Sequence, residues 1–154
     1  MKSLLKYDNM KKLFFLIGII SLSGANIYAQ CDKKVTWTAS KGEFLDEAGN
    51  LQDTKDVKVF IQTSKQEIIL IHSDDELDTL KGKIREITCD WKEPFKNGKI
   101  TLKADLTERS GDYANSVITI EAKDSHITIL LHIEQPDGRK MQIRIPIDSY
   151  KEEG

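Results

Sequence analysis

Several features on which many proteins depend are missing from this 154-residue sequence. It has only three histidines, and two of them, His126 and His132, lie six residues apart, about 20 Å along a strand and too far for one metal ion. No serine has a histidine and a carboxylate at a spacing typical of a hydrolase, and there is no glycine-rich phosphate loop. We therefore expect no catalytic residue, no metal, no cofactor and no enzymatic activity.

An excess of positive charge is also absent. The chain has 23 basic and 25 acidic residues, and residues 1–29 hold four of the lysines and one of the aspartates. The remainder therefore carries 19 basic and 24 acidic residues, a formal charge of −5. Nucleic acids and anionic membranes select basic surfaces, so we expect neither as a partner. The sequence leaves the oligomeric state open.

The sequence also lacks an apolar run long enough to cross a membrane. Its most apolar run, residues 13–22, is ten residues long, whereas a transmembrane helix needs about 20. Two lysines precede this run and small or polar residues follow it up to Ala29, which is the layout of a cleaved secretory signal. We expect residues 1–29 to be a signal peptide, with Met1 or Met10 as the start, and residues 30–154 to be one secreted or periplasmic domain. Gln30 stands where a lipoprotein signal has a small residue, so we expect no lipid on Cys31.

What the sequence does have is regular alternation of apolar and polar residues. Four segments between residues 99 and 147 have an apolar residue at every second position. Successive side chains on a strand point to opposite faces, so each segment has one face for a core and one for water. Shorter patterns predict four more strands, at residues 35–40, 57–62, 68–71 and 83–91. We predict an all-β domain, an eight-stranded antiparallel up-and-down meander closed into a barrel, with a two-sheet sandwich as the alternative.

Alternate connections of such a meander lie at the same end of the domain. The long connections fall together at one end, and we expect binding residues there, because loops on a rigid scaffold commonly carry function. These long connections are residues 41–55, 73–82 and 108–115, joined by the shorter 136–138. The other end has only short connections, at residues 64–66, 92–98 and 124–125, with Asn97-Gly98 as a tight turn.

The acidic connection at residues 73–82 has the signals of a short helix. Ser73 and Glu76 match a capping box, and Asp74 and Asp75 suit the positive end of a helix. Gly82 suits the residue just beyond the other end. We predict a helix at about residues 74–81 and not a calcium loop, because the ligand and glycine spacing of a calcium loop is absent.

The two cysteines, Cys31 and Cys89, both fall at the end with short connections. In an exported chain this placement predicts a disulfide between them. The alternative is that Cys89 is a buried apolar thiol and that Cys31 lies on a frayed end.

Trp37 in the first strand, followed by a long connection and an up-and-down meander, resembles the lipocalin-like group of small secreted barrels. The resemblance implies an apolar ligand inside the barrel, beneath the long loops. Trp37 points inward by alternation, while Phe44 and Tyr113 lie in long loops where an aromatic side chain has less to pack against. We take these three as candidate ligand-binding residues, with core packing as the alternative role for Trp37.

We therefore expect an exported, non-enzymatic protein that holds a small apolar ligand at the rim of long loops. The alternative is a protein-interaction module, such as an inhibitor of an extracellular enzyme or a cell-surface accessory protein. For this alternative, the segment Ser110-Gly111-Asp112-Tyr113 resembles the Ser-Gly loop of small periplasmic lysozyme inhibitors. A hollow interior would favour the first interpretation, whereas a filled interior with Phe44 and Tyr113 exposed would favour the second.

Overall fold

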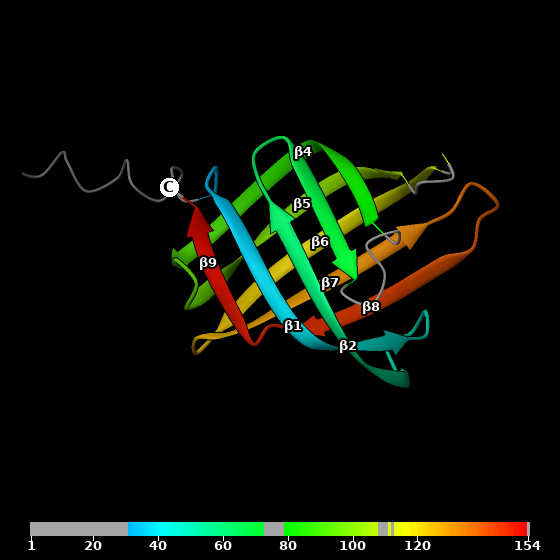
Figure 1. Cartoon of the computed structure of the whole chain (residues 1–154), viewed down its shortest axis with the longest axis horizontal. Coiled ribbons are helices and arrows are strands. Elements are labelled where there is room, and N and C mark those ends of the chain that lie inside the picture. The colour runs from blue at the N-terminus through cyan, green and yellow to red at the C-terminus, as the bar shows by residue number, and fades with distance from the viewer. Residues whose placement is uncertain (1–30, 73–78, 108–110, 112, 154) are drawn as a thin grey trace, which may run out of the picture.

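The protein is an antiparallel β-barrel (Figure 1). The computed structural model describes residues 31–72, 79–107, 111 and 113–153, with only the backbone of Tyr113. Consecutive strands pair from β2 through β8, which confirms the predicted up-and-down meander. The strands are β1 (Lys34–Leu45), β2 (Leu51–Thr63), β3 (Glu67–His72), β4 (Thr79–Glu93), β5 (Asn97–Thr107), β6 (Tyr113–Lys123), β7 (His126–Glu134), β8 (Lys140–Pro146) and β9 (Ser149–Glu153).

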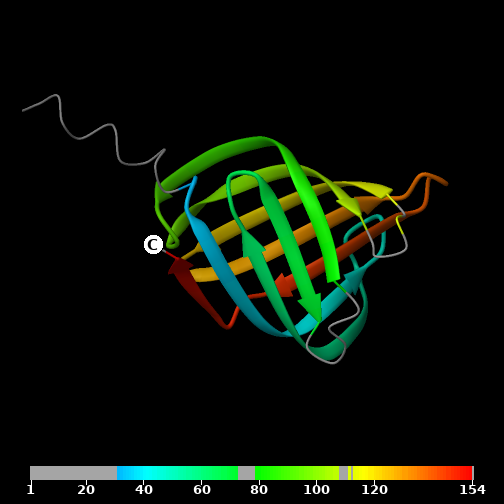
Figure 2. The ribbon, with the colours of Figure 1, turned by 45° about the horizontal axis from the view of Figure 1, so that its top comes forward.

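The first strand closes the barrel. One edge of β1 pairs with β2, and the other edge is shared by β8, which pairs along Glu43–Leu45, and β9, which pairs along Lys34–Thr38. The turn of the sheet around a central core is clearest in Figure 2. This closure confirms the barrel and excludes the sandwich. The alternation did not predict β9, because its residues are mostly exposed and polar; β9 pairs with β1.

The predicted long connection at residues 41–55 is wrong. β1 continues to Leu45, β2 begins at Leu51, and the two pair up to a turn at residues 46–50. The Asp46 carboxylate holds this turn by accepting hydrogen bonds from the backbone amides of Ala48 and Asn50, at 3.0 and 2.8 Å. Most of this ribbon is exposed, so its strands carry no apolar alternation from which they could be recognised.

The predicted helix at residues 74–81 is wrong for residues 79–81, and residues 73–78 lie outside the described residues. Thr79, Leu80 and Lys81 belong to β4, which pairs with β3 on one side. Gly82 was expected beyond a helix end, but it is a point of close packing inside the barrel. A Cβ there would lie 2.7 Å from Leu106 Cδ2 and 2.8 Å from Ile68 Cγ2. Strand pairing and core contacts therefore outweigh the local helix signals here.

Two other connections are shorter than expected. Asn97 and Gly98 belong to β5, and the turn before them is residues 94–96. The connection predicted at residues 108–115 ends before β6 begins at Tyr113. The asymmetry of the two ends nevertheless stands, because the connections at residues 46–50, 73–78, 108–112 and 135–139 are at one end and those at 64–66, 94–96 and 124–125 are at the other. We call these the long-loop end and the short-loop end.

The interior at the short-loop end is filled by aromatic side chains. The rings of Trp37 and Trp91 lie 5.9 and 5.7 Å from that of Phe95, and Tyr150 stacks on Phe95 at 4.7 Å. Trp37 is 1% exposed, and its indole Nε1 donates a 2.9 Å hydrogen bond to the Thr63 hydroxyl. This cluster fills much of the interior at one end of the barrel.

A disulfide joins Cys31 to Cys89, with their Cα atoms 6.1 Å apart, which confirms the predicted pairing. A disulfide fits an extracellular or periplasmic protein, because the cytosol keeps thiols reduced. Within the described residues we find no helix with the length and apolar character that a membrane span requires. The predicted signal peptide, residues 1–29, lies outside the described residues.

Candidate functional site

The long-loop end of the barrel contains a cavity of about 470 Å³. It lies among β1, β2, β3, β4, β7 and β8, and its walls are mostly aliphatic and aromatic side chains. Sites for small molecules are typically apolar hollows of about 300 to 1,000 Å³ with a few polar groups. The residues around it are Gly42, Phe44, Lys55, Asp56, Val57, Val59, Leu70, His72, Leu80, Leu131, Ile133, Met141, Ile143 and Ile145.

β1 changes the face that it turns inward next to a register shift in its pairing with β2, and Phe44 borders the cavity beyond that point. Before the shift, Val35, Trp37 and Ala39 are buried at odd positions. The pairing with β2 shifts between Ala39 and Lys41. Beyond it, even-numbered positions border the cavity, which are Gly42 and Phe44. A bulge of this kind commonly redirects side chains near functional sites, and here it places a half-buried aromatic ring in the wall.

Small residues beside Phe44 leave the interior hollow. Gly42 is buried, and a Cβ built on it has only Ile143 Cγ2 nearby, at 3.9 Å. The neighbouring strand contributes Val57 and Val59 to the wall. The short-loop end carries two tryptophans and a phenylalanine at inward positions, whereas here a glycine and two valines stand, so the same barrel is filled at one end and hollow at the other.

The polar groups around the cavity lie towards its mouth. Lys55 comes near the start of β2, and its ammonium lies 5.0 Å from the centre of the Phe44 ring. His72 is the last residue of β3, so it lies at the long-loop end as well. The deeper positions, such as Leu131 and Ile145, are apolar and at most 3% exposed. The cavity therefore offers an apolar interior and a polar entrance.

An ion pair crosses the closing seam beside the cavity. Arg144 Nε of β8 lies 2.6 Å from Glu43 Oε2 of β1, and Lys41 Nζ lies 3.4 Å from the other carboxylate oxygen. The hydrogen bond from Arg144 is the main cause that lowers the pKa of Glu43, against the opposing effect of burial. β1 and β8 share only three residue pairs here, and this ion pair adds a side-chain contact across the seam.

The three aromatic residues expected at the site are not brought together. Phe44 borders the cavity, but in a strand and not in a loop. Trp37 does not border it and lies in the aromatic cluster of the opposite end. Tyr113 begins β6 at the long-loop end, and its side chain lies outside what is described. Alternation alone did not identify Gly42 or Lys55 as residues of the cavity. It shows which residues point inward, but it does not show how far along the barrel the core is filled.

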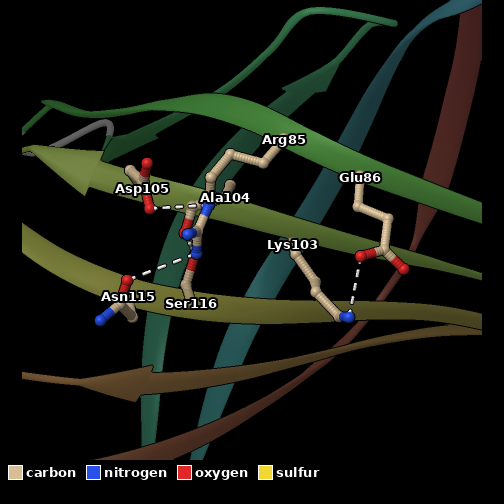
Figure 3. Close-up of polar contacts among 7 residues, drawn as sticks. All are labelled: Arg85, Glu86, Lys103, Ala104, Asp105, Asn115 and Ser116. Carbon is tan, nitrogen blue, oxygen red and sulfur yellow. Dashed lines mark hydrogen bonds and ion pairs between the residues drawn. The ribbon is translucent and has the colours of Figure 1, made fainter.

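The outer face of the barrel is charged, and several of its charges pair with one another. Figure 3 shows Lys103 reaching Glu86 at 2.9 Å, and Arg85 between Asp105 at 3.0 Å and Asn115 at 3.3 Å. A shallower hollow of about 250 Å³ lies on this side and is bordered by Arg85 and Lys103. Because such exposed pairs bring little net stability or affinity, the charges on this face indicate a solvated surface and not a site.

Among the described residues, no group of three or more histidines, cysteines or carboxylates could hold a metal ion. Comparison of the chain with protein-family models, with curated protein sequences and with solved structures found no match.

Proposed function

We propose that the protein is an exported, non-enzymatic binding protein that holds a small apolar ligand in the cavity at the long-loop end. The observation that supports this most is the cavity itself, which measures about 470 Å³ and has mostly apolar walls. It lies at the opposite end of the barrel from the aromatic cluster. Burying apolar ligand surface there is favourable by about 25 cal/mol per Å² before the cost of immobilisation. An apolar ligand inside the barrel is also what the resemblance to lipocalin-like barrels implies.

Gly42 offers a direct test. Replacing it with leucine would place a side chain in the cavity, and the Cβ meets nothing closer than 3.9 Å, so the strand can keep its conformation. We expect the wild type to bind the neutral apolar dye N-phenyl-1-naphthylamine saturably, and Gly42→Leu to lose at least about tenfold in affinity. Dye fluorescence is the readout, because Trp37 and Trp91 are in the cluster at the other end.

Ser40→Leu is the matched control. Ser40 is on the same strand but is exposed, so the same new side chain is added outside the cavity. This variant should bind the dye as the wild type does, and urea unfolding should show both variants folded. Dye binding that is not saturable in the wild type, or that Gly42→Leu leaves unchanged, would refute the proposed function.

The second candidate, a protein-interaction module, is favoured by the hollow on the outer face. Val117 and Met141 border it, and each is 38% exposed. It is the weaker proposal, because Arg85 and Lys103 at the same hollow already pair with carboxylates of this chain. A photo-crosslinker at position 117 should capture one defined protein if this candidate is correct, and His132→Glu, at the position paired with Val117, should abolish the adduct.

A further inference from the structure

Lys55 stands at the mouth of the cavity with its side chain on the inner face. Its Cα pairs with that of Gly42, and directly paired residues of antiparallel strands have their side chains on the same face. Gly42 is buried beside the cavity, and Lys55 shares the inner face with Val57 and Val59, two and four residues on. The ammonium of Lys55 is therefore at the boundary between the apolar interior and water.

This ammonium has no carboxylate partner among the described residues. It lies 5.0 Å from the centre of the Phe44 ring, and it takes part in none of the ion pairs that the described lysines form. Asp56 also borders the cavity, but its Cα pairs with that of the exposed Lys41, which places it on the outer face. The mouth thus presents a positive charge on an aromatic wall. Asp53 shares this face, because its Cα pairs with that of Phe44, but its carboxylate accepts a hydrogen bond from the Thr54 amide and forms no ion pair with Lys55 among the described residues.

An unpaired cation next to an apolar hollow is complementary to a particular kind of molecule. A ligand with an apolar tail and an anionic head can bury the tail among Val57, Leu131 and Ile143 and leave the head at Lys55. A charge-assisted hydrogen bond is about twice as strong as a neutral one, and the apolar surroundings weaken its screening by water. A cationic head in the same place would be repelled.

We infer that the ligand is an apolar molecule with an anionic head group, of which a fatty carboxylate is the simplest example, and that Lys55 pairs with the head. This inference rests on the proposed function and adds the ligand's charge to it. His72 cannot serve the same head group. It is opposite Val59, four residues along β2 from Lys55, which corresponds to about 13 Å at 3.3 Å per residue.

Three ligands of equal chain length separate the contribution of the head from that of the tail. Dodecanoate, dodecan-1-ol and dodecylamine are each used to displace N-phenyl-1-naphthylamine from the full chain at pH 7.5. We expect dodecanoate to compete about tenfold better than dodecan-1-ol, and dodecylamine to compete worst. In Lys55→Met, which keeps the length of the side chain and removes its charge, dodecanoate should lose this advantage while dodecan-1-ol is unaffected.

Lys58 supplies a matched control. It is on the same strand, and its ammonium lies 5.1 Å from the Phe60 ring, but neither residue borders the cavity. Lys58→Met should therefore leave the preference for dodecanoate unchanged.

Each outcome decides a different claim. If the dye is displaced equally by dodecanoate and dodecan-1-ol in the wild type, or best by dodecylamine, the inference about the head group is wrong and the proposed function remains. If Lys55→Met keeps the preference for dodecanoate, or if Lys58→Met removes it as well, the assignment to Lys55 is wrong. If none of the three ligands displaces the dye and the dye does not bind saturably, the proposed function itself fails.

Discussion

Removing the disulfide should destabilise the protein by an amount that follows from its place in the fold. Cys31 precedes β1 and Cys89 is in β4, and these strands are not neighbours, because β2 and β3 lie between them in the sheet. The bond closes a segment with a sequence separation of 58. On the chain-entropy relation, opening a loop of this length costs about 4 kcal/mol at 25 °C, because the unfolded chain regains freedom.

The perturbation is the double variant Cys31→Ala/Cys89→Ala, measured by urea unfolding. Trp37 and Trp91 are both buried near the disulfide, so tryptophan fluorescence and far-ultraviolet circular dichroism should report one coincident transition. The midpoint should fall by an amount equivalent to about 4 kcal/mol, and the m-value should rise, because the unlinked denatured chain exposes more surface. The double variant removes the disulfide and also the packing of the two sulfur atoms. Reduced wild-type protein is the control, because it lacks the disulfide but keeps both cysteine side chains.

The refuting result is a reduced wild-type protein whose free energy of unfolding changes by less than about 1 kcal/mol, which would mean that the link constrains the unfolded chain little. A second check uses the distance between the two ends of the barrel. The cavity is bordered by neither cysteine, so at urea concentrations where the double variant is still folded, dye affinity should equal that of the wild type. A large loss of dye binding there would show that the two ends are coupled.

Two further predictions concern the seam and the core. Glu43→Gln should destabilise the protein by about 1 kcal/mol at pH 7, a small value because the Arg144 side chain is 42% exposed. The pKa of Glu43 is lowered in the folded state, so the stabilisation from its carboxylate is present above the unfolded pKa and is lost as the pH falls through the folded pKa. The urea midpoints of the wild type and of Glu43→Gln should therefore converge as the pH falls below about 4.3. A difference that stays constant with pH would contradict this. Gly82→Ala should cost about 1 to 3 kcal/mol by overpacking, because its Cβ would be 2.7 Å from Leu106 Cδ2; an unchanged thermal midpoint would show that Leu106 can move aside at little cost.

The sequence alone was enough to predict the architecture. Period-two alternation in segments such as residues 127–133 needs no tertiary information, because it follows from the geometry of a strand whose two faces meet different solvents. Once the strands are consecutive and antiparallel, the grouping of the connections at two ends is fixed, and so is the proximity of Cys31 and Cys89 at one of them. These predictions are confirmed because each depends on local pattern and on topology.

Tertiary pairing decided the rest. The ribbon at residues 41–55 and strand β9 have few apolar residues, and they are strands only because a neighbouring strand satisfies their backbone hydrogen bonds. The same holds for residues 79–81, where pairing with β3 outweighs the local helix signals. The cavity depends on a register shift in the pairing of β1 with β2 and on which residues face one another across the interior, and neither can be read from a pattern along one strand. The sequence therefore determined that a barrel forms and how its ends differ, and packing in three dimensions determined which end is hollow and that Phe44 and Lys55 stand at its mouth.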